Sequence, residues 1–168
     1  MLKLKDIPKF DDVKKLWNNI KNNDKIDIKH KILLGFVMLS GCRISEILRI
    51  KRKDIDFERA IVRIRQSKKR KEFYREIIIP KDLLDLIKEN KWWDGFDFTR
   101  QNAFYIVKKW TSYHPHAFRH SFAIELLSKT KNMEFVRRLL GHSNYNIIRY
   151  YLDFTIEDIK EEILKIYD

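Results

Sequence analysis

The sequence predicts an α+β domain that is mainly α-helical and has a small antiparallel β-sheet. Apolar residues recur every three or four positions through most of the 168 residues, which is typical of amphipathic helices. Between residues 55 and 80 this spacing gives way to alternation, which is typical of strands. Gly and Pro number only 4 and 3, and we find no linker, low-complexity tract or repeat. We therefore expect residues 1–168 to form a single domain.

The first 50 residues predict three helices. Residues 11–20 carry apolar side chains on one face, with an aspartate at the start as a plausible cap. Residues 28–39 are apolar nearly all round, which predicts a buried helix, and Gly41 follows as a typical C-terminal residue. Residues 45–50 predict a short third helix that turns Ile47 and Leu48 inward.

Residues 55–80 predict two or three antiparallel strands. Val62 and Ile64 alternate with Arg63 and Arg65, and residues 73–79 are rich in β-branched and aromatic side chains. The sequence QSKKRK at residues 66–71 predicts a basic turn between strands. A soluble hairpin tip would suffice to explain it, but four consecutive cations repel one another unless something negative lies opposite.

The second half predicts more helices. One spans residues 82–89, and another spans 101–110 with Lys108 and Lys109 exposed at its end. The loop at 91–99 between them is aromatic; its rings could stack on bases, but packing against the core is favoured. The aromatic residues are Trp92, Trp93, Phe96 and Phe98.

The C-terminal third predicts further helical segments. Pro115 opens a helix that contains His116. Residues 132–140 form a short helix, capped by Asn132 and closed by Gly141. We expect residues 146–151 and 155–168 to be helical as well. The last segment carries an apolar stripe, which could pack on the same chain or dock in trans on a neighbouring subunit.

The composition indicates a nucleic-acid-binding protein. Lys and Arg total 36 against 24 acidic residues, for a net charge of +12, and the pI is about 9.7; the alternative is merely a solvated basic surface. Cys42 is the only cysteine, which excludes an internal disulfide and favours a small buried hydrophobic role. We find no signal peptide and no apolar run that could span a bilayer, so we expect a cytoplasmic protein.

One cluster of residues indicates phosphate chemistry. On a helix His116 and Arg119 share a face, and His120 lies one turn from His116. A guanidinium fork beside an imidazole suits a phosphate, and a nearby tyrosine could attack that phosphate covalently. The alternative is a metal site formed by His114, His116 and His120, which is disfavoured because Arg119 would repel a cation.

Five sequence fragments stand out by their order and spacing. They are GCRISEIL at 41–48, QSK at 66–68, PHAFRHSFA at 115–123, LLGHSN at 139–144 and Tyr151. In this order and spacing they resemble the catalytic domain of a tyrosine recombinase, the phage-integrase and Xer-like family. The resemblance extends from about residue 11 to the C-terminus and implies that the sheet lies at one edge of the domain.

The resemblance implies a role for each matching position. Two arginines would bind the non-bridging oxygens of the scissile phosphate, and a tyrosine would be the nucleophile. A hairpin lysine would protonate the leaving oxygen, and two histidines would assist the proton transfer from the tyrosine. Glu46 would orient its neighbours. The catalytic positions are Arg43, Lys68, His116, Arg119, His142 and Tyr151.

Two of these positions have neighbours that could replace them. Lys69 or Lys71 could take the place of Lys68, and Tyr150 that of Tyr151. Further DNA contacts are expected from side chains near the site and on exposed surfaces. These are Lys69, Arg70, Lys71, Lys108, Lys109 and His120.

The resemblance implies cleavage and rejoining of double-stranded DNA through a covalent 3′-phosphotyrosine. It implies no cofactor, metal or small-molecule substrate, and a homodimer or tetramer on DNA. The chain begins almost where the family's catalytic domain begins, so we expect the N-terminal DNA-clamping domain to be absent. Alternatives are nicking and resealing alone, as in a type IB topoisomerase, a non-catalytic DNA-binding remnant, and a metal-dependent nuclease.

Overall fold

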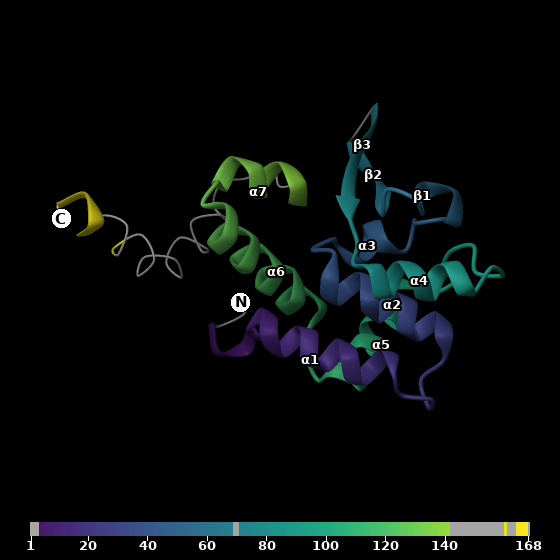
Figure 1. The fold of residues 1–168 in the computed structure, drawn as a ribbon. Coiled ribbons are helices and arrows are strands. Elements are labelled where there is room, and N and C mark those ends of the chain that lie inside the picture. Colours follow the sequence, from purple (N-terminus) through teal and green to yellow (C-terminus); the bar gives the residue numbers. More distant parts are fainter. Residues whose placement is uncertain (1–3, 69–70, 142–159, 161–163, 168) are drawn as a thin grey trace.

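A computed structural model of the chain describes residues 4–68, 71–141, 160 and 164–167. Helix α2 (Ile28–Leu39) lies at the centre of the helical body (Figure 1) and contacts α1 (Phe10–Lys21), α4 (Lys81–Glu89), α5 (Arg100–Thr111) and α6 (Pro115–Thr130). All of its residues from 31 to 39 are buried. The prediction of a helix that is apolar all round is thus confirmed, because a helix surrounded by neighbours has no solvent face.

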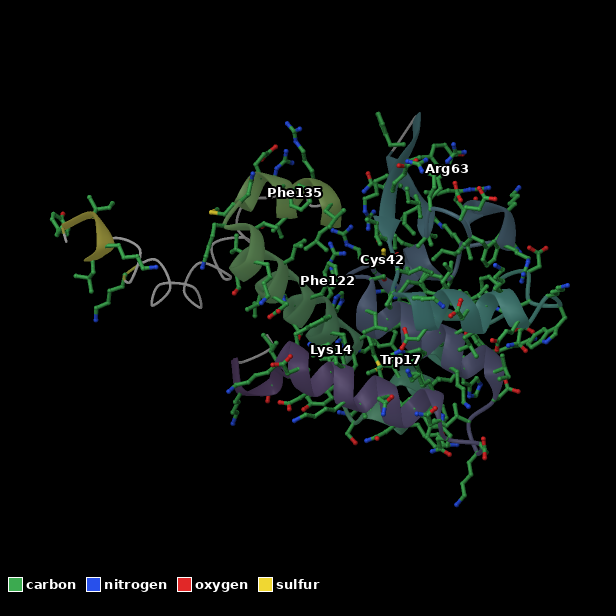
Figure 2. All side chains as sticks on the ribbon, viewed as in Figure 1. Lys14, Trp17, Cys42, Arg63, Phe122 and Phe135 are labelled. Carbon is green, nitrogen blue, oxygen red and sulfur yellow. The ribbon has the colours of Figure 1, made fainter. Side chains whose placement is uncertain are left out.

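Helix α1 is fastened to the start of α4 by polar contacts across the body. The indole nitrogen of Trp17, a residue labelled in Figure 2, donates to the Asp82 carboxylate at 2.8 Å, and the Lys21 ammonium donates to the same oxygen at 3.0 Å. Asp82 also accepts from the Leu83 backbone N–H at 2.8 Å. One carboxylate therefore joins two helices that lie 60 residues apart in sequence.

Among the described residues, β1 (Ile55–Asp56), β2 (Ile61–Lys68) and β3 (Lys71–Ile78) form one antiparallel sheet in the order β1-β2-β3. The ladder between β2 and β3 runs from the pair Ile61↔Ile78 to the pair Lys68↔Lys71. The predicted turn at 66–71 is therefore wrong in extent. Backbone ladder bonds do not depend on side-chain polarity, so the strands continue through the basic residues up to Lys68 and from Lys71.

The sheet stands at one edge of the molecule, beside α7 (Met133–Leu140) (Figure 1). Its inner face carries Val62, Ile64 and Ile77, which are all buried. Its outer face is solvated and carries the Arg63 guanidinium 5.0 Å from the centre of the Tyr74 ring. Strand β2 begins at Ile61, because Ala60 has a φ of 55° and belongs to the turn before the strand.

The aromatic loop after α4 packs against the core, as predicted. Trp93 is buried, and the Phe96 ring contacts Trp93 at 5.2 Å and Phe36 at 6.3 Å between centroids. Phe98 stacks on Phe96 at 6.1 Å. Trp92 is the exception, with 57% of its surface exposed. The loop thus closes the end of the helical body.

The remaining helices follow the predictions with small changes. Helix α3 spans Ile44–Ile47 and is shorter than the predicted 45–50. Asn132 caps α7 by accepting from the Phe135 N–H at 2.9 Å, and Gly141 closes it with a φ of 69°. The predicted helix at 146–151 lies outside the described residues, and of 155–168 residues 160 and 164–167 are described and helical. None of the helices in the described part is long and apolar enough to cross a membrane.

Arg52, in the short 3-10 helix η2 (Arg52–Asp54), holds the end of α4. Its guanidinium donates to the carbonyls of Ile87 at 3.0 Å and Asn90 at 3.2 Å, which a helix end leaves unsatisfied. We predict that Arg52→Met lowers the free energy of unfolding by about 2 kcal/mol, as measured by urea denaturation. The exposed Arg59→Met is the control, expected within about 0.5 kcal/mol of the wild type. Equal stability of the two variants would contradict this capping role.

Candidate active site

The start of α6 presents a histidine in a fixed orientation. His114 precedes the helix, and its Nδ1 accepts a hydrogen bond from the His116 N–H at 3.2 Å. The two imidazole rings stack with centroids 5.2 Å apart and planes 18° apart. Phe104 of α5 contacts the His114 ring edge-on at 5.2 Å. The aromatic contacts and the cap therefore orient the His116 ring.

Arg119 lies one turn further along α6 and is 4% exposed. Its Nη2 donates to the Leu140 carbonyl at 2.9 Å, and its Nη1 donates to the Gly41 carbonyl. These carbonyls belong to the end of α7 and to the loop before α3. The guanidinium thus joins three segments that lie far apart in the sequence.

Arg43 enters the site from the residue before α3. Its backbone N–H donates to Glu46 Oε2 at 2.9 Å, and its Nη1 lies 3.4 Å from Glu46 Oε1. The Arg43 side chain is 37% exposed, so part of its guanidinium faces solvent. Glu46 thus contacts both the backbone and the side chain of Arg43.

These groups converge on a pocket of about 40 Å³. Arg43, Arg119 and His116 line it, as the sequence predicted for a shared site, and Arg100 lines it as well. Its wall consists of Cys42, Arg43, Ile44, Ser45, Arg100, Phe104, Pro115, His116 and Arg119. Guanidinium forks that point into one small space form a site for an anion with several oxygens, such as a phosphate.

Arg100 was not predicted. It is the first residue of α5, and its guanidinium lies 5.6 Å from the centre of the Phe104 ring. Nothing in its sequence neighbourhood distinguishes it from other surface arginines. Only the packing of α5 against α3 and α6 brings it to the pocket.

Two glycines allow the loops around the pocket to approach each other. Gly41 has a φ of 71°, and a Cβ atom there would lie 2.7 Å from a methyl carbon of Leu140. Gly141 has a φ of 69°, and a Cβ there would collide with the Gln66 amide. Both positions need a residue without a side chain, for conformation and for space. They bring the segment of Arg43, the end of α7 and the hairpin together.

A further residue missed by the sequence analysis is Arg75 of β3. Its Nη1 and Nη2 donate to the two oxygens of Glu46, each at 2.8 Å. One sequence signal could have revealed it, because Arg75 has the same parity along its strand as the buried Ile77 and Ile79. An arginine on the inner face of a sheet requires a partner of opposite charge.

The charge states of the site follow from these contacts. Burial alone would raise the pKa of Glu46, but the Arg75 guanidinium, the Arg43 backbone N–H and the Arg119 charge together more than offset this, so the net pKa lies below the usual value. Burial, followed by the neighbouring His114 and the surrounding arginines, lowers the pKa of His116. At neutral pH the site therefore holds an ionised Glu46 and a neutral His116.

His120 was predicted to contact DNA. Burial and its cationic neighbours lower its pKa from 6.5 to about 4, so it is neutral at neutral pH. It therefore adds no positive charge to the site there, and any contact it makes with a phosphate would be a hydrogen bond between a neutral donor and an anion.

The alternative metal site at His114, His116 and His120 finds no support in the geometry. Within the part of the chain that the structure describes, no three His, Cys, Asp or Glu side chains are grouped closely enough to hold a metal ion. In addition, the His114 Nδ1 is occupied by the His116 N–H.

The other predicted site residues lie next to or within undescribed segments of the chain, or away from the pocket. Lys68 is the last residue of β2, where its backbone pairs with Lys71. Lys108 and Lys109 are exposed at the opposite end of α5, about 12 Å along the helix from Arg100. They do not join the pocket. Outside the described residues lie Lys69, Arg70, His142, Tyr150 and Tyr151.

The described part of the chain thus combines a three-stranded antiparallel sheet at the edge of a helical body with an arginine-lined pocket at the start of α6. The sequence profile of the phage integrase family matches residues 9–93 and 98–157. The chain belongs to the phage integrase family.

Known proteins similar to this chain are tyrosine recombinases. It is 27% identical over 171 residues to the tyrosine recombinase XerA of Thermococcus kodakarensis, a match that covers 90% of this chain and 59% of that protein. It is 29% identical over 182 residues to XerD of Oceanobacillus iheyensis, covering 95% and 61%. The chain thus spans about three fifths of the length of these relatives.

Solved structures share the fold. A crystal structure of XerA recombinase superimposes with a TM-score of 0.75 at 17% identity, covering 93% of this chain and 62% of that one. XerH site-specific recombinase bound to a palindromic difH substrate, in a post-cleavage complex, superimposes with a TM-score of 0.79 at 21% identity, covering 99% and 54%. The predicted fold class is confirmed.

The lowered pKa of His120 predicts a pH dependence of stability. The unfolded chain binds a proton at this residue near pH 6.5, and the folded chain only near pH 4. The unfolded state therefore binds more protons between these values, and stability falls as the pH drops through them. We predict that His120→Asn reduces the stability lost between pH 7 and pH 4.5 by about 1–2 kcal/mol, allowing for partial solvent screening.

Urea denaturation of both proteins at the two pH values tests this. Other titrating groups are common to both proteins and cancel in the comparison. The same loss of stability in both proteins would show that His120 titrates normally in the folded chain.

Proposed function

We propose that this chain is the catalytic part of a site-specific DNA recombinase or integrase, which cleaves and rejoins DNA through a covalent 3′-phosphotyrosine. The observation that carries the proposal is the convergence of Arg43, Arg100, Arg119 and His116 on one small pocket. The family membership and the five sequence fragments support the same reading.

Charge neutralisation is the main requirement of phosphoryl transfer, because negative charge spreads over the non-bridging oxygens in the transition state. Arg43 is well suited to this role, since its guanidinium is partly exposed and shares Glu46 with Arg75. Arg119 donates to the carbonyl oxygens of Gly41 and Leu140, which hold its guanidinium at the wall of the pocket.

The remaining roles complete the exchange of bonds. The Tyr151 oxygen would attack phosphorus, and the bond from phosphorus to the 5′-oxygen would break. His116, neutral at pH 7, can take the phenolic proton directly or through water, assisted by His142. Lys68 would protonate the departing 5′-oxygen. A DNA 5′-hydroxyl can later reverse these steps without ATP, since the phosphotyrosine conserves the bond energy.

The match to the family fragment QSK favours Lys68 as the hairpin lysine over its neighbours Lys69 and Lys71.

Double-stranded DNA is the proposed substrate. The XerH structure contains a difH substrate, and the Tn1549 transposon integrase was solved with transposon right end DNA. The net charge of +12 supports such a partner for this chain. We further propose a cytoplasmic location, assembly as a dimer or tetramer on DNA, and docking of the segment at 155–168 in trans.

Replacement of the proposed nucleophile tests the function directly. We predict that Tyr151→Phe abolishes covalent attachment to DNA while it leaves DNA affinity within about threefold of the wild type, because only one oxygen is lost. The protein is incubated with supercoiled plasmid in EDTA, denatured, and examined for relaxed DNA and for a protein–DNA adduct.

Tyr150→Phe is the matched control and should retain the adduct. An adduct that survives Tyr151→Phe but is lost in Tyr150→Phe would move the nucleophile by one residue. Survival in both variants would rule out the tyrosine mechanism.

Arg43→Ala tests the phosphate clamp with little effect on folding. The side chain is 37% exposed, and within the described part of the chain its guanidinium is held by the 3.4 Å contact with Glu46, so stability should change little. We predict that the rate of adduct formation falls by a factor equivalent to about 3 kcal/mol. Single-turnover cleavage at saturating DNA measures this rate. A rate within a few-fold of the wild type would exclude Arg43 from transition-state stabilisation.

A further inference from the structure

Arg75 is a buried arginine that links the segments of the proposed active site. Beyond its paired bonds to Glu46, its Nε donates to the Leu139 carbonyl at 2.7 Å, and its Nη2 lies 3.5 Å from the Cys42 sulfur. Its side chain is only 9% exposed. Cys42, labelled in Figure 2, lies at this junction of the hairpin, α3 and α7.

Each contact of Arg75 reaches a different part of the site. Glu46 in turn accepts a hydrogen bond from the Arg43 backbone N–H at 2.9 Å, which links Arg75 to the segment of Arg43. Leu139 lies three residues before His142, at the end of α7. Arg75 itself lies on the hairpin strand that pairs with Lys68. Arg75 therefore connects three separate segments that hold members of the family's catalytic set: the hairpin on which it lies, the segment of Arg43 and the end of α7.

The energetics of buried ion pairs favour a geometric role for this contact. Desolvation of both charges offsets much of their attraction, so a buried pair adds little net stability over an apolar pair of the same size. A fork that donates along Nε, Nη1 and Nη2 fixes direction as well as distance, which neither an apolar side chain nor a lysine can do. The pair thus specifies how the three segments meet.

We propose that Arg75 is a positioning residue for strand cleavage. It fixes the Arg43 segment and the end of α7 relative to the hairpin, so that the phosphate-binding groups converge on one point. Arg75 acts through these segments, since its guanidinium is engaged by Glu46 and Leu139 and its side chain is only 9% exposed. The proposal rests on the proposed function for its effect on cleavage, but its effect on the junction can be measured separately.

The cleavage experiment uses Arg75→Met, which removes the charge, and Arg75→Lys, which keeps it without the fork. We predict that Arg75→Met slows adduct formation at saturating DNA by at least about tenfold, that Arg75→Lys restores only part of the rate, and that DNA affinity changes by less than about threefold. Arg52→Met is the matched control, because it too removes an arginine that donates to carbonyls, but far from the site. It should cleave at the wild-type rate.

A second measurement does not depend on catalysis. Cys42 is the only cysteine of the chain and is 4% exposed, so native-state alkylation by iodoacetamide reports on this junction alone. We predict labelling about tenfold faster in Arg75→Met than in the wild type or Arg52→Met, because the junction opens locally. Loss of the cation by itself would raise the pKa of the thiol and slow labelling, so acceleration can only come from opening.

The outcomes separate the two proposals. Slow cleavage with fast labelling in the Arg75 variants, and neither in Arg52→Met, supports the positioning role. Wild-type cleavage by Arg75→Met overturns it. If the wild type forms no adduct, the proposed function fails, and the labelling rates alone decide whether Arg75 has the positioning role. Equal labelling rates in Arg75→Met and Arg52→Met would overturn that role. Faster labelling in Arg75→Met alone would support it. If Arg75→Met does not fold, Arg75→Lys is read by the same criteria.

Discussion

The buried carboxylate of Glu46 is the contact on which the site depends. Arg43 and Arg75 both bind it, at 3.4 Å and 2.8 Å. Two guanidinium groups brought this close in a partly buried environment would repel each other strongly without a shared anion. The pKa of Glu46 lies below its usual value despite burial, because Arg75, the Arg43 N–H and the Arg119 charge together stabilise the anion, and this keeps it charged.

The surrounding arginines divide into two kinds by their partners. Arg75 meets a full negative charge and is neutralised. Arg119 donates to the carbonyls of Gly41 and Leu140. Arg100 lies over the aromatic ring of Phe104. Arg75 thus holds the segments of the site together, whereas Arg43, Arg100 and Arg119 line the pocket itself, where their guanidinium groups are preorganised for an anion such as a phosphate.

Much of the fold could be predicted because its signals are local. Residues 28–39 are apolar on every side, and this alone placed them at the centre. The glycines at 41 and 141 marked helix ends, and the structure shows that they also allow close approach. The extent of the hairpin could not be predicted, because basic residues weaken the strand pattern while the backbone ladder continues through them.

The sequence by itself determined the class of fold, the family resemblance and the grouping of His116 with Arg119, because one helical turn places residues three apart on the same face. Only the tertiary structure decided that Arg100 reaches the pocket and that Arg75 pairs with Glu46. The contact between Arg75 and Glu46 joins residues 29 positions apart, and the pocket brings Arg100 together with Arg43 from a distant segment; both depend on how α3, α5, α7 and the sheet pack together. No local pattern encodes such distances, since the same arginine on an unpacked helix or strand would simply face water.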